Sequence, residues 1–158
     1  VHCFNFDPEI EDWAQANADT VKFIRTPVLG SNLWRLYGQT YFTMQELGIL
    51  GENHVRFFTD IHTARRNLSS LDTVAAWFEG KGTTEAAFRA AFNSENVRRR
   101  LAKADALSRA YKISSVPSVV VNAKYLIGVN SEVGTKRLLE VTEHLLSKPE
   151  QTQEEKPS

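Results

Sequence analysis

Apolar residues recur at helical spacing over the first eighteen positions of the chain. Four of them repeat every three or four residues: Phe6, Ile10, Trp13 and Ala14. This spacing predicts an amphipathic helix over residues 1–18. In residues 20–28, polar and apolar side chains then alternate, and β-branched residues are frequent, so we predict a strand there. Pro27 has no N–H group, which indicates that this strand ends there or lies at a sheet edge.

The helical period continues through residues 32–111, with short breaks marked by glycine and serine. Gly48 and Gly51 bracket one break, and Gly80 and Gly82 mark another. The pattern predicts five helices, over 32–48, 52–67, 71–80, 83–91 and 94–111.

The period changes to two after this block. Residues 117–122 contain a run of valines suited to a strand buried on both faces, and residues 125–129 form a second strand two positions later. The pair predicts a β-hairpin. Its loop contains Asn122 and Ala123, which differ from the Asn-Gly pair that a tight type I′ turn prefers, so we expect a strained loop or another turn type.

A final amphipathic helix is predicted over residues 132–147, and residues 148–158 form a polar tail that we expect to be disordered. The order is helix, strand, block of helices, two strands and helix. With one more strand before Val1, this is an α/β fold of the thioredoxin type with an all-helical insertion. The expected units are a thioredoxin-like core over 1–31 and 112–147 and a helical subdomain over 32–111.

Composition narrows the class of protein. The 158 residues are 42% hydrophobic and 24% charged with zero formal net charge, as in an ordinary globular domain. The sequence has no excess of basic residues that would indicate nucleic-acid binding. It also has no apolar run as long as the ~20 residues that a membrane-spanning helix requires. A single cysteine, Cys3, excludes an internal disulfide and a cysteine-based zinc site. The histidines His54, His62 and His144 are too scattered to suggest a metal site, so we expect no metal or cofactor.

Two motifs near opposite ends of the chain carry a more specific signal. His2-Cys3 opens the first predicted helix and is followed by Phe-Asn-Phe-Asp-Pro, and residues 115–122 read Ser-Val-Pro-Ser-Val-Val-Val-Asn. Together they resemble the DsbA family. Proteins of that family have Cys-X-His-Cys followed by an aromatic-X-Phe-acidic run at the start of the first helix. Near the other end they have a cis-proline loop before a β-hairpin. The resemblance covers residues 1–147.

The resemblance implies a redox site at the start of the first helix. Val1-His2-Cys3 matches the last three residues of Cys-Val-His-Cys, so Cys3 is expected to be the buried resolving thiol. The nucleophilic cysteine and a central strand are then expected before Val1, outside this chain. A helix N-terminus favours a thiolate because its free N–H groups carry partial positive charge, and a histidine such as His2 adds a donor nearby.

Four other positions match the family's site. Val116 and Pro117 resemble the cis-proline loop, and we expect their peptide bond to be cis and to lie beside Cys3. Asp7 and Arg25 resemble the buried acidic residue and its basic partner beneath the active site. From the residues alone, Cys3 is also compatible with an inert core thiol, and Asp7 with an acidic residue of a first helical turn.

The resemblance implies a thiol:disulfide oxidoreductase that donates disulfide bonds to folding secreted or periplasmic proteins. Its implied partners are reduced, unfolded polypeptides and a DsbB-like, quinone-linked membrane oxidase, and its implied location is the bacterial periplasm. We expect a monomer that binds no nucleic acid. Two alternatives remain open: a redox-inactive DsbA-like binding module, and an enzyme similar to kappa-type glutathione transferases. The residue directly before Val1 would distinguish them, with cysteine for the oxidoreductase and serine for the transferase.

Overall fold

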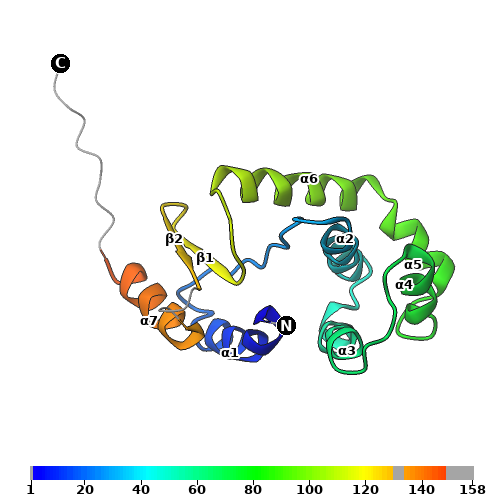
Figure 1. Ribbon diagram of the computed structural model, residues 1–158, viewed down its shortest axis with the longest axis horizontal. Helices are drawn as coiled ribbons and strands as arrows, with labels where there is room; N and C mark the ends of the chain where they lie inside the picture. Colours follow the sequence, from blue (N-terminus) through cyan, green and yellow to red (C-terminus); the bar gives the residue numbers. More distant parts are fainter. Residues whose placement is uncertain (1, 130–133, 149–158) are drawn as a thin grey trace, which may run out of the picture.

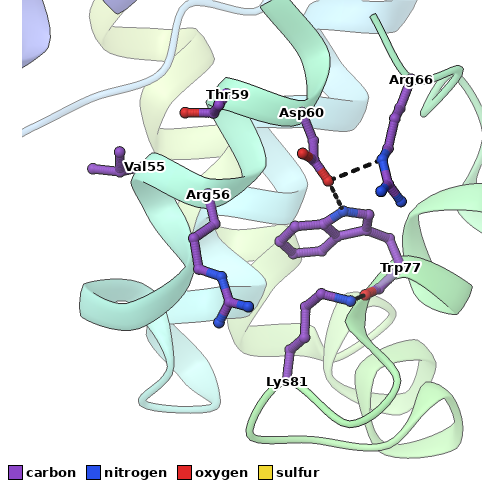
Figure 2. Close-up of a pocket in the computed structure, with 7 residues that line it drawn as sticks. All are labelled: Val55, Arg56, Thr59, Asp60, Arg66, Trp77 and Lys81. Atoms are coloured by element: carbon purple, nitrogen blue, oxygen red, sulfur yellow. Dashed lines mark hydrogen bonds and ion pairs between the residues drawn. The ribbon is translucent and has the colours of Figure 1, made fainter. Parts of the chain in front are cut away.

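The computed structural model describes residues 2–129 and 134–148. Figure 1 shows their helices and strands in chain order. These elements are α1 (His2–Ala16), α2 (Asn32–Glu46), α3 (Leu50–His62), α4 (Leu71–Phe78), α5 (Glu85–Phe92), α6 (Glu95–Ala110), β1 (Ser118–Val121), β2 (Tyr125–Gly128) and α7 (Thr135–Leu146).

One side of the molecule consists of α1, α7 and the β1–β2 hairpin (Figure 1). The strands are antiparallel, with Ser118 opposite Gly128 and Val121 opposite Tyr125. The core of this part is built from α1 and α7, with side chains of the hairpin packed against it. Its buried members are Phe6, Ile10 and Leu138.

The other side consists of α2 to α5, and α6 runs from this group back toward the hairpin (Figure 1). Aromatic side chains dominate the core between these helices. Phe78 is fully buried and stacks on Phe88 with ring centroids 4.3 Å apart, and Phe57 also stacks on Phe78 at 5.6 Å. A second cluster joins α2 to α6 through Phe42, Val97 and Leu101. The boundaries of a separate helical subdomain stay a prediction.

Side-chain caps determine where four of these helices begin. A hydroxyl oxygen accepts a hydrogen bond from an N–H group of the first turn, which would otherwise have no partner in the helix. The capping residues are Ser31 for α2, Ser70 for α4, Thr84 for α5 and Ser94 for α6. Each hydroxyl residue stands directly before its helix, so the sequence itself specifies these starts.

The strand predicted over residues 20–28 is not formed. The segment is extended, and its exposure alternates as the sequence pattern predicted, with Phe23 packed against the α1–α7 core and Ile24 67% exposed. A strand also requires a hydrogen-bonded neighbour. In the described part of the chain, the only sheet is the β1–β2 hairpin, and residues 22–28 make no main-chain hydrogen bond to it.

The hairpin loop is one residue longer than predicted. β1 ends at Val121, so residues 122–124 connect it to Tyr125. The Lys124 N–H donates to the Val121 carbonyl at 3.0 Å, and φ is 50° at Asn122 and 54° at Ala123. Positive φ at both central residues is the signature of a type I′ turn. The turn is therefore tight, and it holds Ala123 in a conformation that glycine would adopt more easily.

Helix α3 ends five residues earlier than its predicted limit of residue 67. After His62 the chain reverses through Arg65, where φ is 51°, and the Arg66 N–H donates to the Asp60 carbonyl. This reversal turns Leu68 into the core, where it is 6% exposed. Tertiary packing thus overrides the helical pattern here. The predicted start of the last helix at residue 132 and the tail over 149–158 lie outside the described residues.

Candidate active site

Cys3 lies in the first turn of α1 and is exposed. The expectation that Cys3 is the buried resolving thiol of an intact motif stays a prediction. The buried face of α1 begins only at Phe6, which is 4% exposed, so Cys3 precedes the part of the helix that the core covers. Partial loss of water around the sulfur nevertheless raises the pKa of the thiol. The negative charge of Asp7 adds to this rise.

Asp7 lies one helical turn after Cys3 and pairs with Arg25 from the extended segment. Arg25 Nη1 donates to Asp7 Oδ1, and Arg25 Nη2 donates to Glu11 Oε2 at 2.7 Å. The side chains of Asp7 and Arg25 are only 14% and 23% exposed. The sequence predicted these two residues as partners, and the structure brings them together. The ion pair holds the extended segment against α1.

The sequence analysis missed a third member of this group, His54 of α3. Its Nε2 atom lies 3.1 Å from Asp7 Oδ2 and 3.2 Å from Arg25 Nη1. The His54 side chain is 15% exposed. A signal was present in the sequence, because His54, Phe58 and His62 are spaced four residues apart and share one face of a helix. That face is the one that α3 turns toward α1.

The Asp7 carboxyl has opposing influences on its pKa. Partial burial acts to raise it. The hydrogen bond with His54, the charge of His54 and the charge and hydrogen bond of Arg25 together outweigh burial and hold the pKa of Asp7 below its usual value. Asp7 is therefore a carboxylate at neutral pH, with negative charge on the same helix as Cys3.

Aromatic contacts continue the interface between α1 and α3 toward the start of α1. Phe4 meets Phe58 edge-on with centroids 6.2 Å apart and lies 5.4 Å from the His62 ring. Burial lowers the pKa of His62. The neutral imidazole is thus the form that suits this apolar contact.

The proline loop leads directly into β1. The Val116–Pro117 peptide bond is cis, as predicted. Ser118 Oγ donates a hydrogen bond to the Ser115 carbonyl at 2.6 Å across the loop. The Val129 N–H donates to the Pro117 carbonyl at 3.4 Å. Among the described residues, no hydrogen bond joins this loop to Cys3. His2 is the first residue of α1, and its side chain lies outside the described part of the structure.

Within residues 2–129 and 134–148, no group of three or more histidine, cysteine or acidic side chains is arranged to hold a metal ion. The helices of this part of the chain include none with the length and apolar character needed to cross a membrane.

A family model described as a DSBA-like thioredoxin domain matches residues 6–140. The chain belongs to this family. Thiol:disulfide interchange protein DsbA of Azotobacter vinelandii is 34% identical over 152 residues, which are 96% of this chain and 71% of the relative. The protein of the same name from Pseudomonas aeruginosa is 31% identical over 147 residues, or 93% and 70% of the two chains. A crystal structure of Pseudomonas aeruginosa DsbA matches with a TM-score of 0.85 at 30% identity, over 92% of this chain and 76% of that one.

Membership of the DsbA-like family confirms the family that the two end motifs predicted. The DsbA fold is a thioredoxin fold with a helical insertion, so the predicted fold class is confirmed as well. The roles of the individual site residues rest on the motifs and on the contacts described above.

Proposed function

We propose that this protein is a thiol:disulfide oxidoreductase that donates disulfide bonds to other proteins. The observation that carries the proposal is the position of Cys3, in the first turn of α1, within a DsbA-like thioredoxin domain. Relatives that share about a third of its residues are thiol:disulfide interchange proteins. Exposure of Cys3 gives a thiol or disulfide at this helix end access to a substrate.

The proposed reaction exchanges one disulfide for another. A substrate thiolate attacks the disulfide of the Cys-X-His-Cys motif, of which Cys3 is the second cysteine, and a mixed disulfide forms as one motif thiolate leaves. A second substrate thiolate then attacks the mixed disulfide. The substrate gains a disulfide, and the motif keeps the two electrons as a dithiol. Cys3 is the thiol released in the first step, and no cofactor takes part.

The surroundings of Cys3 influence which redox form is favoured. Free N–H groups at a helix start favour a thiolate, which favours the reduced dithiol and makes the disulfide a better oxidant. His2, next to Cys3 in the sequence, is proposed to add to this effect. Burial and, to a smaller extent, the negative charge of Asp7 act in the opposite direction by raising the pKa of Cys3. Arg25 limits the effect of Asp7 by pairing with it.

The loop before β1 is proposed to hold the substrate chain. Val116 is half-buried, and among the described residues its main-chain N–H and C=O make no hydrogen bond. Such free groups beside a strand suit an extended peptide that binds by strand addition. Pro117 follows with its cis bond and places β1 directly behind the loop.

The proposed substrates are reduced, unfolded polypeptides in the bacterial periplasm. A DsbB-like membrane oxidase would return the motif to the disulfide form by passing its electrons to a quinone. The names of the DsbA relatives support the exchange chemistry, and the partners and the location belong to the proposal.

Oxidation of a reduced dithiol peptide by the natural protein tests the proposal. We expect one peptide disulfide per protein disulfide in the absence of other oxidants. A Cys3→Ser variant cannot form the motif disulfide, so it should leave the dithiol peptide reduced. Peptide binding without oxidation would instead establish a binding module. Glutathione conjugation would establish a transferase.

A further inference from the structure

His54 is the one residue of the helical block that hydrogen-bonds the charge pair beneath Cys3 among the described residues. It reaches this pair from α3, 47 positions away from Asp7 and 29 away from Arg25 in the sequence. Its ring is held by packing, because Phe58 meets it edge-on with centroids 4.8 Å apart and Tyr41 of α2 lies at 5.9 Å. The Nε2 atom therefore has a fixed position.

This position gives the imidazole a choice between two partners. The Asp7 carboxylate can only accept a hydrogen bond, and the Arg25 guanidinium can only donate one. If Nε2 carries hydrogen, His54 donates to Asp7 at 3.1 Å. If Nε2 carries a lone pair, it accepts from Arg25 at 3.2 Å, and the carboxylate loses a donor. The form of the ring thus determines how well the charge of Asp7 is neutralised.

Asp7 is close enough to Cys3 for this choice to matter. The two residues are four positions apart on α1 and so lie on the same face of the helix. Burial is the main cause of the raised pKa of the Cys3 thiol, and the negative charge of Asp7 adds to it by disfavouring the thiolate. A donor that neutralises Asp7 therefore favours the thiolate.

We propose that His54 is a positioning residue for the redox site: it orients and neutralises the Asp7 carboxylate and thereby links the chemistry of Cys3 to the helical block. This inference deepens the proposed function and rests on it for its biological meaning. The charged or titratable groups facing His54 are Asp7 and Arg25, which contact it, Glu11, which binds the other end of Arg25, and the Tyr41 hydroxyl.

The test measures the pKa of Cys3 in the 158-residue chain from the pH dependence of its alkylation by iodoacetamide. Cys3 is the only cysteine, so the signal belongs to one thiol. His54→Phe keeps the aromatic packing and removes both nitrogens. His54→Gln keeps an N–H donor without a titratable ring. His144→Phe is the matched control, because His144 is an exposed histidine of α7.

We expect alkylation of the His54→Phe chain at neutral pH to be slower by about two- to threefold, since a less neutralised carboxylate raises the thiol pKa. His54→Gln should recover most of the rate, and His144→Phe should leave it unchanged. The decisive comparison uses Asp7→Asn: with that carboxylate removed, His54→Phe should have no further effect.

Equal rates in the His54→Phe and parent chains would overturn the proposal, and so would an unchanged effect in the Asp7→Asn background. Circular dichroism of each variant identifies loss of fold, in which case His54→Leu, which also removes both nitrogens, replaces His54→Phe in both backgrounds. The titration requires no disulfide exchange. A natural protein that fails to oxidise a dithiol peptide can therefore still show the His54 effect, and the two failures remain distinguishable.

Discussion

The ring of Phe4 on α1 and the imidazole of His62 on α3 lie with centroids 5.4 Å apart, tilted at 40°. Phe58 stacks on the same imidazole at 5.7 Å. A titratable ring therefore forms part of an aromatic contact between the first helix and the helical block. Charging that ring within an apolar contact is unfavourable, which makes the contact sensitive to pH.

Replacing His62 by phenylalanine should make stability less dependent on pH. The folded protein lowers the pKa of His62 from the ordinary 6.5, so the unfolded chain binds the proton more readily. The stabilising contribution of neutral His62 is therefore fully present above 6.5 and is lost as pH falls through the lower folded value. Urea unfolding at pH 7.5 and pH 5 should show a smaller loss for His62→Phe than for the parent chain. His144→Phe serves as the control, and an identical loss in all three chains would contradict the prediction.

Removing the Asp7 carboxylate should have its largest effect at neutral pH. Asp7→Asn breaks the pairing with Arg25 and should lower the free energy of unfolding by about 1–3 kcal/mol at pH 7. Because the folded state lowers the Asp7 pKa from 3.8, this contribution is present above that value and disappears as pH falls through the folded pKa. The difference between the two chains should thus shrink by pH 3.

The comparison for this carboxylate is Asp12→Asn, which removes an exposed acidic group from the same helix. Chemical denaturation of the three chains at both pH values provides the measurement. A loss of stability in Asp12→Asn equal to that in Asp7→Asn would show that the net charge of α1, and not the ion pair, is responsible.

Gly38 of α2 is required by the close approach of the extended segment. A Cβ atom at this position would lie 2.6 Å from Leu29 Cδ2 and 3.1 Å from Pro27 Cβ. The leucine tip can move, but the proline ring is fixed to the main chain. Gly38→Ala should therefore lower stability by about 1–3 kcal/mol despite the better helix propensity of alanine.

The matched control for Gly38 is Gly51→Ala in α3, where an added Cβ meets nothing within 4 Å. That change should be neutral or raise stability by up to about 1 kcal/mol. Thermal melts of both variants provide the comparison. If both alanines stabilise equally, the extended segment does not press on α2 as described.

Ala123→Gly should stabilise the hairpin. Ala123 has φ of 54°, a conformation that is unfavourable for a residue with a Cβ atom and easy for glycine. We expect a gain of about 0.5–1 kcal/mol in the free energy of unfolding. The same exchange at Ala102, an exposed position inside α6, should instead cost about 1 kcal/mol. Equal losses at the two positions would be inconsistent with a left-handed turn at residue 123.

The local elements were predictable because their signals are local. Hydroxyl residues stand before α2, α4, α5 and α6, and they cap those helices as the sequence suggests. The hairpin follows from its run of valines. The end of α3 was not predictable in this way, because burial of Leu68 in the aromatic core determines where the chain leaves the helix.

In the candidate site, too, contacts that a motif indicates were predictable and contacts that depend on helix packing were not. The pairing of Asp7 with Arg25 followed from the family motif. The part played by His54 did not, because it depends on how α3 packs against α1 and not on any residue near Asp7 in the sequence.

The extended segment over residues 22–28 is held in place by its side chains. Its main-chain groups pair with no strand in the described structure, so it has the features of an open sheet edge. Arg25 ties it to Asp7 and Glu11 of α1, and Phe23 packs against the α1–α7 core. A strand that paired with this edge would add main-chain hydrogen bonds without disturbing these side-chain contacts. The segment therefore has the shape of a sheet strand before it has a strand partner.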